Sequence, residues 1–323
     1  MKLKSANSNF SRLGCILCAA AFASLSVPSP SIAGQSTTPA AVVAPQTFAS
    51  PELAVDALVA AAAKFDTQAL TQIFGSASAD IAITSEPALD RKHAADFTEQ
   101  VAKKKQVSVD PKSKSRAFLL IGEEEWPFPV PLVKTGGKWS FDGKAGKQEL
   151  LYRRIGSNEL DAIDICEGYV EAQQEYGLRQ RSINEVNEYA QRIISSDGKQ
   201  DGLAWKNSDG SWGGPIGENI AKAIEQGWTS KSQPYHGYFF KILKGQGPAA
   251  HLGAIDFVVK GAMIGGFALV AAPAEYGVTG VRTYIVSHDG IVFEKDLGPK
   301  TLDEFKTMEL YNPDKSWTPT PGS

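Results

Sequence analysis

The feature that most constrains the fold is a run of short apolar segments, separated by glycines, between Tyr235 and Gly298. Eleven of the chain's 30 glycines lie in residues 237–298. The Asp289-Gly290 pair is a strong hairpin signal, and Lys260-Gly261 should also turn the chain. Short strands joined by tight turns pair with their neighbours, so this stretch predicts a compact antiparallel meander.

We expect a four-stranded sheet there, with a long helix packed on it. The segments that should supply strands are residues 237–243, 255–259, 267–272, 281–287 and 291–294. Upstream, Asn158 can cap a helix that ends near Gly177, with Leu160, Ile163, Cys166 and Val170 as its apolar stripe. Together with a last helix from Thr301 to about Leu310, these elements define a domain over residues 151–310, followed by a tail at 311–323.

Residues 48–150 predict a smaller α+β domain of helices on an antiparallel sheet. Ser50-Pro51 is typical of a helix start, Asp66 opens a second helix that ends near Gly75, and a third is expected from Asp90 to about Lys104. Ala117–Ile121 is an apolar strand. Every second residue is a proline at Pro127, Pro129 and Pro131. Alternate N–H groups of a strand point to the same edge, so these prolines remove hydrogen-bond donors from one edge only. The pattern predicts an outer strand of the sheet. A turn at Gly136-Gly137 should return the chain.

Residues 1–33 have the outline of a secretory signal. Lys2, Lys4 and Arg12 precede or border an apolar run, and Ser31-Ile32-Ala33 places small residues at a cleavage site. An uncleaved membrane anchor is the alternative. Cleavage after Ala33 would leave 30 basic and 36 acidic residues, because all three charged residues removed are basic. The signal segment predicts a periplasmic or secreted protein. A net charge of −6 gives the mature chain no basic surface for nucleic acid, so no nucleic-acid partner is expected.

Residues 34–47 are small and polar and predict a flexible linker. Cys166 would be the one cysteine left after cleavage, so no internal disulfide is expected, and its place on a helical stripe favours a buried thiol. Short helices are predicted at 186–194 and 216–226. The aspartates between them lack the spacing of a calcium loop, so turns explain them better.

The sequence predicts no catalytic residues, no cofactor and no metal. Gly245-x-Gly247-x-x-Ala250 looks like a dinucleotide fingerprint, but no helix is expected after it. The Glu123–Glu125 triplet is better explained as a solvated turn. One polar cluster could form beside the C-terminal sheet, from Glu275, Tyr276, Arg282, His236 and His251. The simplest explanation of these polar residues is an ion pair of Arg282 with Glu275 or Asp296.

Several segments resemble known families. The motifs EEEWPFPVPLV, ELDAIDICEGYVEAQQEYG, FFKILKGQGPAA and GGFALVAAPAEYGVTGVRTYIVSHDGIVFEKDLG resemble the bacterial exported family called domain of unknown function 2950, over residues 47–318. The C-terminal half is similar to the globular heads of type IV pilins and pseudopilins, in which a helix lies across a four-stranded sheet. It lacks their apolar N-terminal helix. The N-terminal pattern resembles the cone-shaped nuclear-transport-factor-like fold.

Two classes of function remain open at this point. The first is a non-catalytic envelope protein that binds a partner protein or assembly. The second is a hydrolase-like exported enzyme with a site between the two halves, which a histidine within hydrogen-bond reach of a carboxylate in a pocket would favour. The sequence leaves the oligomeric state open.

Overall fold

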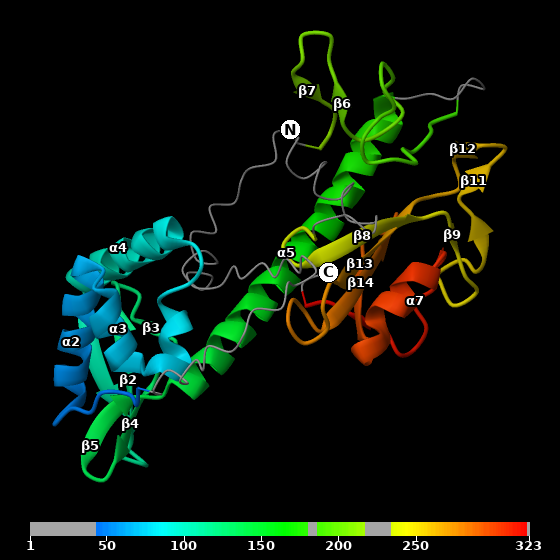
Figure 1. The fold of residues 1–323 in the computed structure, drawn as a ribbon. Coiled ribbons are helices and arrows are strands. Elements are labelled where there is room, and N and C mark those ends of the chain that lie inside the picture. The colour runs from blue at the N-terminus through cyan, green and yellow to red at the C-terminus, as the bar shows by residue number, and fades with distance from the viewer. Residues whose placement is uncertain (1–42, 180–185, 217–233, 322–323) are drawn as a thin grey trace, which may run out of the picture. The chain divides into compact units, whose positions relative to one another are not determined.

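The computed structural model describes residues 43–179, 186–216 and 234–321, and these fall into two compact units that divide between Arg153 and Arg154. Both units combine helices with antiparallel sheets, so the predicted α+β class is confirmed (Figure 1). In the described residues no helix is both long and apolar enough to cross a membrane. The proposed signal segment and most of the linker lie outside the described residues.

The helices of the N-terminal unit begin where local capping signals place them. They are α2 (Pro51–Lys64), α3 (Thr67–Phe74), the short 3-10 helix η1 (Ser76–Ile81) and α4 (Pro87–Lys103). The Ser50 hydroxyl accepts from the Leu53 amide at 3.3 Å, and the Asp66 carboxylate accepts from the Ala69 amide at 3.0 Å. Helix α4 begins three residues before Asp90 because Pro87 occupies its first turn.

The sheet of this unit contains β1 (Lys105–Val109), β2 (Arg116–Ile121), β3 (Trp126–Pro127), β4 (Leu132–Thr135) and β5 (Lys138–Phe141). Its order is β1-β2-β4-β5, with β3 also paired to β2. The turn at Gly136-Gly137 is confirmed, with φ of 59° and 83°. The outer-strand prediction is wrong, since β4 lies between β2 and β5. The prolines instead fall where the strand is interrupted, between Pro127 and Leu132.

Helix α5 (Gly143–Arg179) is much longer than predicted. Its start is fixed by Asp142, whose carboxylate accepts from the Ala145 amide at 3.0 Å, so the predicted start at Asn158 is wrong. The Asn158 amide instead donates to the Thr279 carbonyl at 2.8 Å. An asparagine inside a long helix looks in the sequence like an asparagine that caps one. Here the Asn158 side chain makes a tertiary hydrogen bond instead of a cap.

The main sheet of the C-terminal unit has five strands in the order β17-β15-β14-β13-β8. Their bounds are Tyr238–Leu243 for β8, Ala268–Pro273 for β13, Arg282–Ser287 for β14, Val292–Asp296 for β15 and Thr318–Pro319 for β17. The predicted four-strand meander is present, and β17 adds a fifth strand from the segment that was expected to be a tail. The hairpin turn at Asp289-Gly290 is confirmed.

A side excursion from the main sheet contains the strand that was predicted at residues 255–259, in two short pieces. It contains β9 (Gly245–Gln246), β10 (Ile255–Asp256), β11 (Val258–Val259) and β12 (Ala262–Met263), and β9 pairs in parallel with β16 (Leu310–Tyr311). Lys260 and Gly261 form the β11–β12 turn with φ of 50° and 87°, as predicted. The last helix, α7, covers only Thr301–Thr307.

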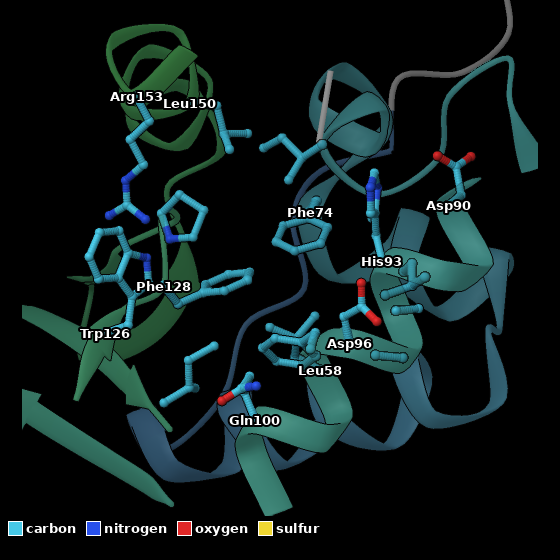
Figure 2. A pocket seen from close by; sticks show the side chains of 18 residues that line it. Leu58, Phe74, Asp90, His93, Asp96, Gln100, Trp126, Phe128, Leu150 and Arg153 are labelled. Carbon is cyan, nitrogen blue, oxygen red and sulfur yellow. The ribbon is translucent and has the colours of Figure 1, made fainter. Parts of the chain in front are cut away.

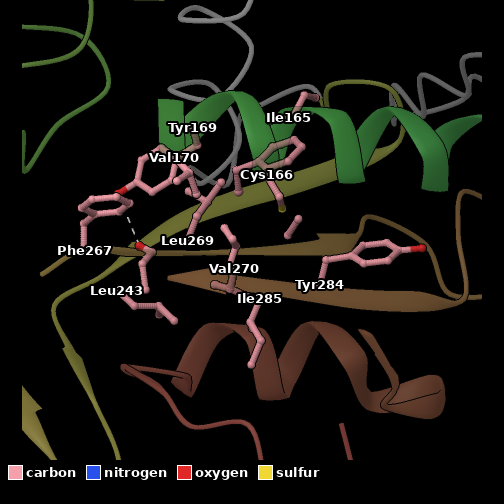
Figure 3. Close-up of a cluster of buried hydrophobic side chains, with 14 of the residues drawn as sticks. Ile165, Cys166, Tyr169, Val170, Leu243, Phe267, Leu269, Val270, Tyr284 and Ile285 are labelled. Carbon is pink, nitrogen blue, oxygen red and sulfur yellow. Dashed lines mark hydrogen bonds between the residues drawn. The ribbon is translucent and has the colours of Figure 1, made fainter. Parts of the chain in front are cut away.

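Helices α5 and α7 lie on the two faces of the C-terminal sheet (Figure 3). The buried stripe of α5 consists of Ala162, Ile165, Cys166, Tyr169 and Val170. Leu160 is 58% exposed, so its assignment to that stripe is wrong, because it falls on the opposite side of the helix from Ala162. Cys166 is fully buried, and burial raises the pKa of its thiol, as expected for a structural cysteine.

The helix predicted at residues 186–194 is absent. Tyr189 forms a β-bridge with Met263, and Ile194 forms one with Ala204. The short strands β6 (Trp205–Lys206) and β7 (Trp212–Gly213) follow. The backbone of this segment is hydrogen-bonded to residues outside it, and helix propensity, which depends on neighbouring residues, does not predict such pairing. Most of the helix predicted at 216–226 lies outside the described residues.

Candidate functional site

An apolar pocket lies within the N-terminal unit (Figure 2). It has a volume of about 80 Å³, several times the roughly 10–15 Å³ that one water molecule needs. Its walls come from α2, α3, η1, α4, β2, β3 and the start of α5. The lining side chains are Leu58, Ala62, Leu70, Phe74, Ile81, Ala82, Asp90, His93, Ala94, Asp96, Phe97, Gln100, Ile121, Trp126, Phe128, Pro129, Leu150 and Arg153.

Two polar atoms in this wall are buried without a hydrogen-bond partner in the described part of the chain. They are the indole Nε1 of Trp126 and the Nδ1 of His93. A buried polar group without a partner costs about 1–3 kcal/mol, and nearly all such groups in proteins are satisfied. Figure 2 shows the two side chains on different sides of the pocket, with Phe74 and Phe128 between them.

The two ends of the pocket differ in charge. Near His93 lie Asp90 and Asp96, while Arg153 stacks over Trp126 with its Cζ atom 5.3 Å from the ring centroid. Burial lowers the pKa of His93 below its usual 6.5, so the imidazole is neutral at neutral pH. Both carboxylates already have partners, because Asp90 accepts from the amide and hydroxyl of Thr84 and Asp96 pairs with Lys92 at 2.6 Å.

Local sequence explains how these side chains reach the pocket. On α4, residues 90, 93, 94 and 97 follow helical spacing and line one face. Trp126 follows a turn in which Gly122 and Glu125 have positive φ, 73° and 56°. Glu123, Glu124 and Glu125 are exposed in that turn, which confirms the prediction of a solvated turn. The sequence reasoning missed this site, although the spacing on α4 was a readable signal.

The predicted polar cluster is only partly assembled in the C-terminal unit. His236 lies with Nδ1 2.5 Å from Oδ2 of Asp161, and its ring stacks near that of Tyr235. The Tyr276 hydroxyl donates to Asp296 at 3.2 Å, and the Glu275 amide donates to the Thr279 hydroxyl. His251 is exposed on the side excursion, where its backbone carbonyl accepts from Gln246.

Arg282 does not form the expected pair with Glu275 or Asp296, since no ion pair within 4 Å involves it in the described residues. Its backbone amide donates to Glu159 at 3.0 Å, and Asp296 instead accepts from Tyr276 and from the amide of Gly298. The carboxylates near Arg282 are therefore engaged in backbone and hydroxyl contacts that fix the turns at this end of the sheet.

The glycine-rich stretch at 245–250 has a structural explanation. A side chain at Gly247 would place its Cβ 2.5 Å from the Asn312 side chain, so close packing requires glycine there. Turns follow it in place of a helix, as expected, so no helix N-terminus is present to hold a pyrophosphate. Across the described ranges, no three side chains of histidine, cysteine, aspartate or glutamate are grouped to hold a metal ion.

The chain is a two-unit α+β protein with an apolar pocket in its first unit. The model of the family described as "Protein of unknown function (DUF2950)" matches residues 45–320, and the chain belongs to this family. No curated protein and no solved structure matches the chain. No solved structure therefore supports the resemblance to pilin heads.

Proposed function

We propose that this protein is an exported, non-catalytic binding protein whose N-terminal unit holds a small apolar molecule. The observation that carries the proposal is the pair of buried, unpartnered nitrogens of Trp126 and His93 in an apolar pocket. A ligand that met both would supply hydrogen-bond partners that no described residue provides. Ligand sites in proteins are typically apolar with a few convergent polar groups, as here.

Blocking the pocket tests this proposal directly. Ala94 lines the pocket on α4, whereas Ala95 is exposed on the same helix. Thermal unfolding of the purified protein should be measured with benzoate, benzyl alcohol and hexanoate. At a hundredfold excess over Kd, a ligand that binds only the folded state stabilises by about 2.7 kcal/mol.

We expect at least one of the three probes to raise Tm in the wild type and in Ala95→Phe, but not in Ala94→Phe, whose ring fills the pocket. If no probe raises Tm, or if Ala94→Phe responds as the wild type does, the pocket is not a binding site and the proposal fails.

Export is part of the same proposal, and the charge and hydropathy of residues 1–33 support it. Cleavage after Ala33 would place the mature protein in the periplasm or outside the cell, with Gly34 at its N-terminus. Mass spectrometry of the protein recovered from the envelope and the medium would test this. A full-length N-terminus on membrane-bound protein would support the uncleaved anchor instead.

For the C-terminal unit we propose a structural or assembly role with an envelope protein partner. The helix α5 on an antiparallel sheet supports the likeness to pilin heads, but α7 covers the other sheet face. A partner would therefore meet the sheet edge or the outer helix surfaces. Affinity capture from envelope extract should recover one specific protein. A monomeric protein that captures nothing would count against this role.

A hydrolase-like enzyme is the second candidate, and the His236–Asp161 contact favours it. A histidine oriented by a carboxylate is the arrangement of a general base. His236 is 47% exposed, and in the described residues no serine, threonine or cysteine side chain bonds to it. Ester hydrolysis that is lost in His236→Gln would support this candidate, and equal activity in that variant would exclude it.

A further inference from the structure

We propose that the ligand of the N-terminal pocket is a small apolar molecule with one carboxylate, which points toward Arg153 and Trp126. This inference rests on the proposed binding function and adds the chemical class of the ligand. It follows from the polar groups that remain open in the wall of the pocket and from the charge difference between its two ends.

Arg153 provides the positive end. Its side chain is 14% exposed, and its Nε atom donates to Glu149 at 2.8 Å. In the described residues the terminal Nη groups have no hydrogen-bond partner, so the guanidinium keeps donors for a ligand. Arginine matches a carboxylate with two parallel hydrogen bonds, and such charge-assisted bonds are stronger than neutral ones. A guanidinium in the wall of an apolar pocket therefore favours an anionic group beside it.

Trp126 strengthens the same preference. An indole N–H can only donate, and a carboxylate can only accept, so the unpartnered Nε1 selects an acceptor. The cation–π contact places the guanidinium of Arg153 over the indole ring, which brings the two donors to one end of the pocket. Arg153 and the indole N–H can only donate, and so can an ammonium group, which therefore finds no complementary partner in either.

The opposite end explains why one carboxylate is expected and not two. His93 is neutral at neutral pH, and Asp90 and Asp96 lie near it, so a second anion there would meet like charge. A cationic group gains little at that end because Thr84 and Lys92 already engage the two carboxylates. Between the ends, Phe74 and Phe128 offer apolar surface for a ring or a short alkyl chain.

The test compares three ligands of nearly equal size that differ in charge: benzoate, benzyl alcohol and benzylamine. Their affinities for the purified protein should be measured by calorimetry at neutral pH. A charge-assisted hydrogen bond contributes about 1.5–3 kcal/mol, so we expect benzoate to bind at least about tenfold more tightly than benzyl alcohol. Benzylamine should bind most weakly.

Variants of Arg153 assign the preference to a residue. Arg153→Met should weaken benzoate binding about tenfold more than benzyl alcohol binding, since it removes the charge and keeps an apolar chain. Arg153→Lys keeps the charge and should keep the order of the three ligands. Arg116→Met, an exposed arginine on β2, is the matched control and should behave as the wild type.

The inference is overturned if benzyl alcohol binds as tightly as benzoate, or if Arg153→Met keeps the preference for benzoate. Either result would overturn only the preference for a carboxylate. The proposed binding function would still stand if benzyl alcohol binds and Ala94→Phe blocks its binding. If none of the three ligands binds, the proposed function itself fails.

Discussion

His93 and Trp126 face one apolar pocket from different elements, α4 and β3, and each leaves a buried ring nitrogen without a hydrogen-bond partner in the described residues. The two atoms belong to side chains more than thirty positions apart in the sequence. Only the tertiary fold brings these two side chains to one pocket. The first two predictions below follow from this relationship.

The first prediction concerns Trp126→Phe. The variant removes the unpartnered donor but also part of a ring that packs against Arg153, so its two effects on the unfolding free energy oppose each other and the net change should stay below about 2 kcal/mol. Benzoate binding should nevertheless weaken, because the ligand loses a donor. Urea unfolding and calorimetry measure the two effects. Trp317 lies outside the pocket, so Trp317→Phe is the control and should not change benzoate affinity. Unchanged benzoate affinity in Trp126→Phe would contradict the role of the indole nitrogen as a donor to the ligand.

The second prediction concerns pH and His93. Burial lowers the pKa of His93 in the folded state, so protonation favours the unfolded state. The contribution of the neutral imidazole is fully present above the unfolded pKa of about 6.5 and is lost as the pH falls through the lower folded pKa. Stability measured between about pH 7 and pH 5 should therefore fall less in His93→Gln than in the wild type.

The matched control for that experiment is His251→Gln, which changes an exposed histidine on the side excursion of the other unit. It should reproduce the wild-type pH dependence. Parallel curves for His93→Gln and the wild type would contradict the assignment of a depressed pKa to His93.

The third prediction concerns Gln173 in the C-terminal unit. This fully buried side chain accepts from the Ala190 amide at 2.8 Å and donates to the Ala190 carbonyl at 2.7 Å, as a neighbouring strand would. Gln173→Ala leaves both backbone groups buried without partners and should destabilise the protein by about 2–3 kcal/mol. Gln174→Ala, on the exposed side of α5, should change the unfolding free energy by less than about 0.5 kcal/mol. Equal effects of the two variants would contradict this account.

The sequence predicted the features that depend on neighbouring residues. The caps at Ser50 and Asp66 and the turns at Gly136-Gly137, Lys260-Gly261 and Asp289-Gly290 all form where their residue types indicate. Each of these requires only a side chain that bonds a few residues away or a backbone that tolerates positive φ.

Features that depend on distant partners were missed or misjudged. The side chain of Asn158 could cap a helix, but it bonds to Thr279, and the true cap at Asp142 sets a longer helix. The three prolines remove donors at a break in the strand and do not mark an edge. The pocket was missed because its lining comes from seven elements, although the spacing of His93, Ala94 and Phe97 already indicated one face of α4.

The measurement that tests the central claim most directly is heteronuclear NMR of the Trp126 indole N–H during titration with benzoate. The chain has six tryptophans, and Trp126→Phe identifies the signal. The account predicts a saturable shift of the Trp126 indole resonance toward the values of hydrogen-bonded N–H groups, which Ala94→Phe abolishes. An indole signal of Trp126 that stays fixed while benzoate binds the folded protein would contradict it.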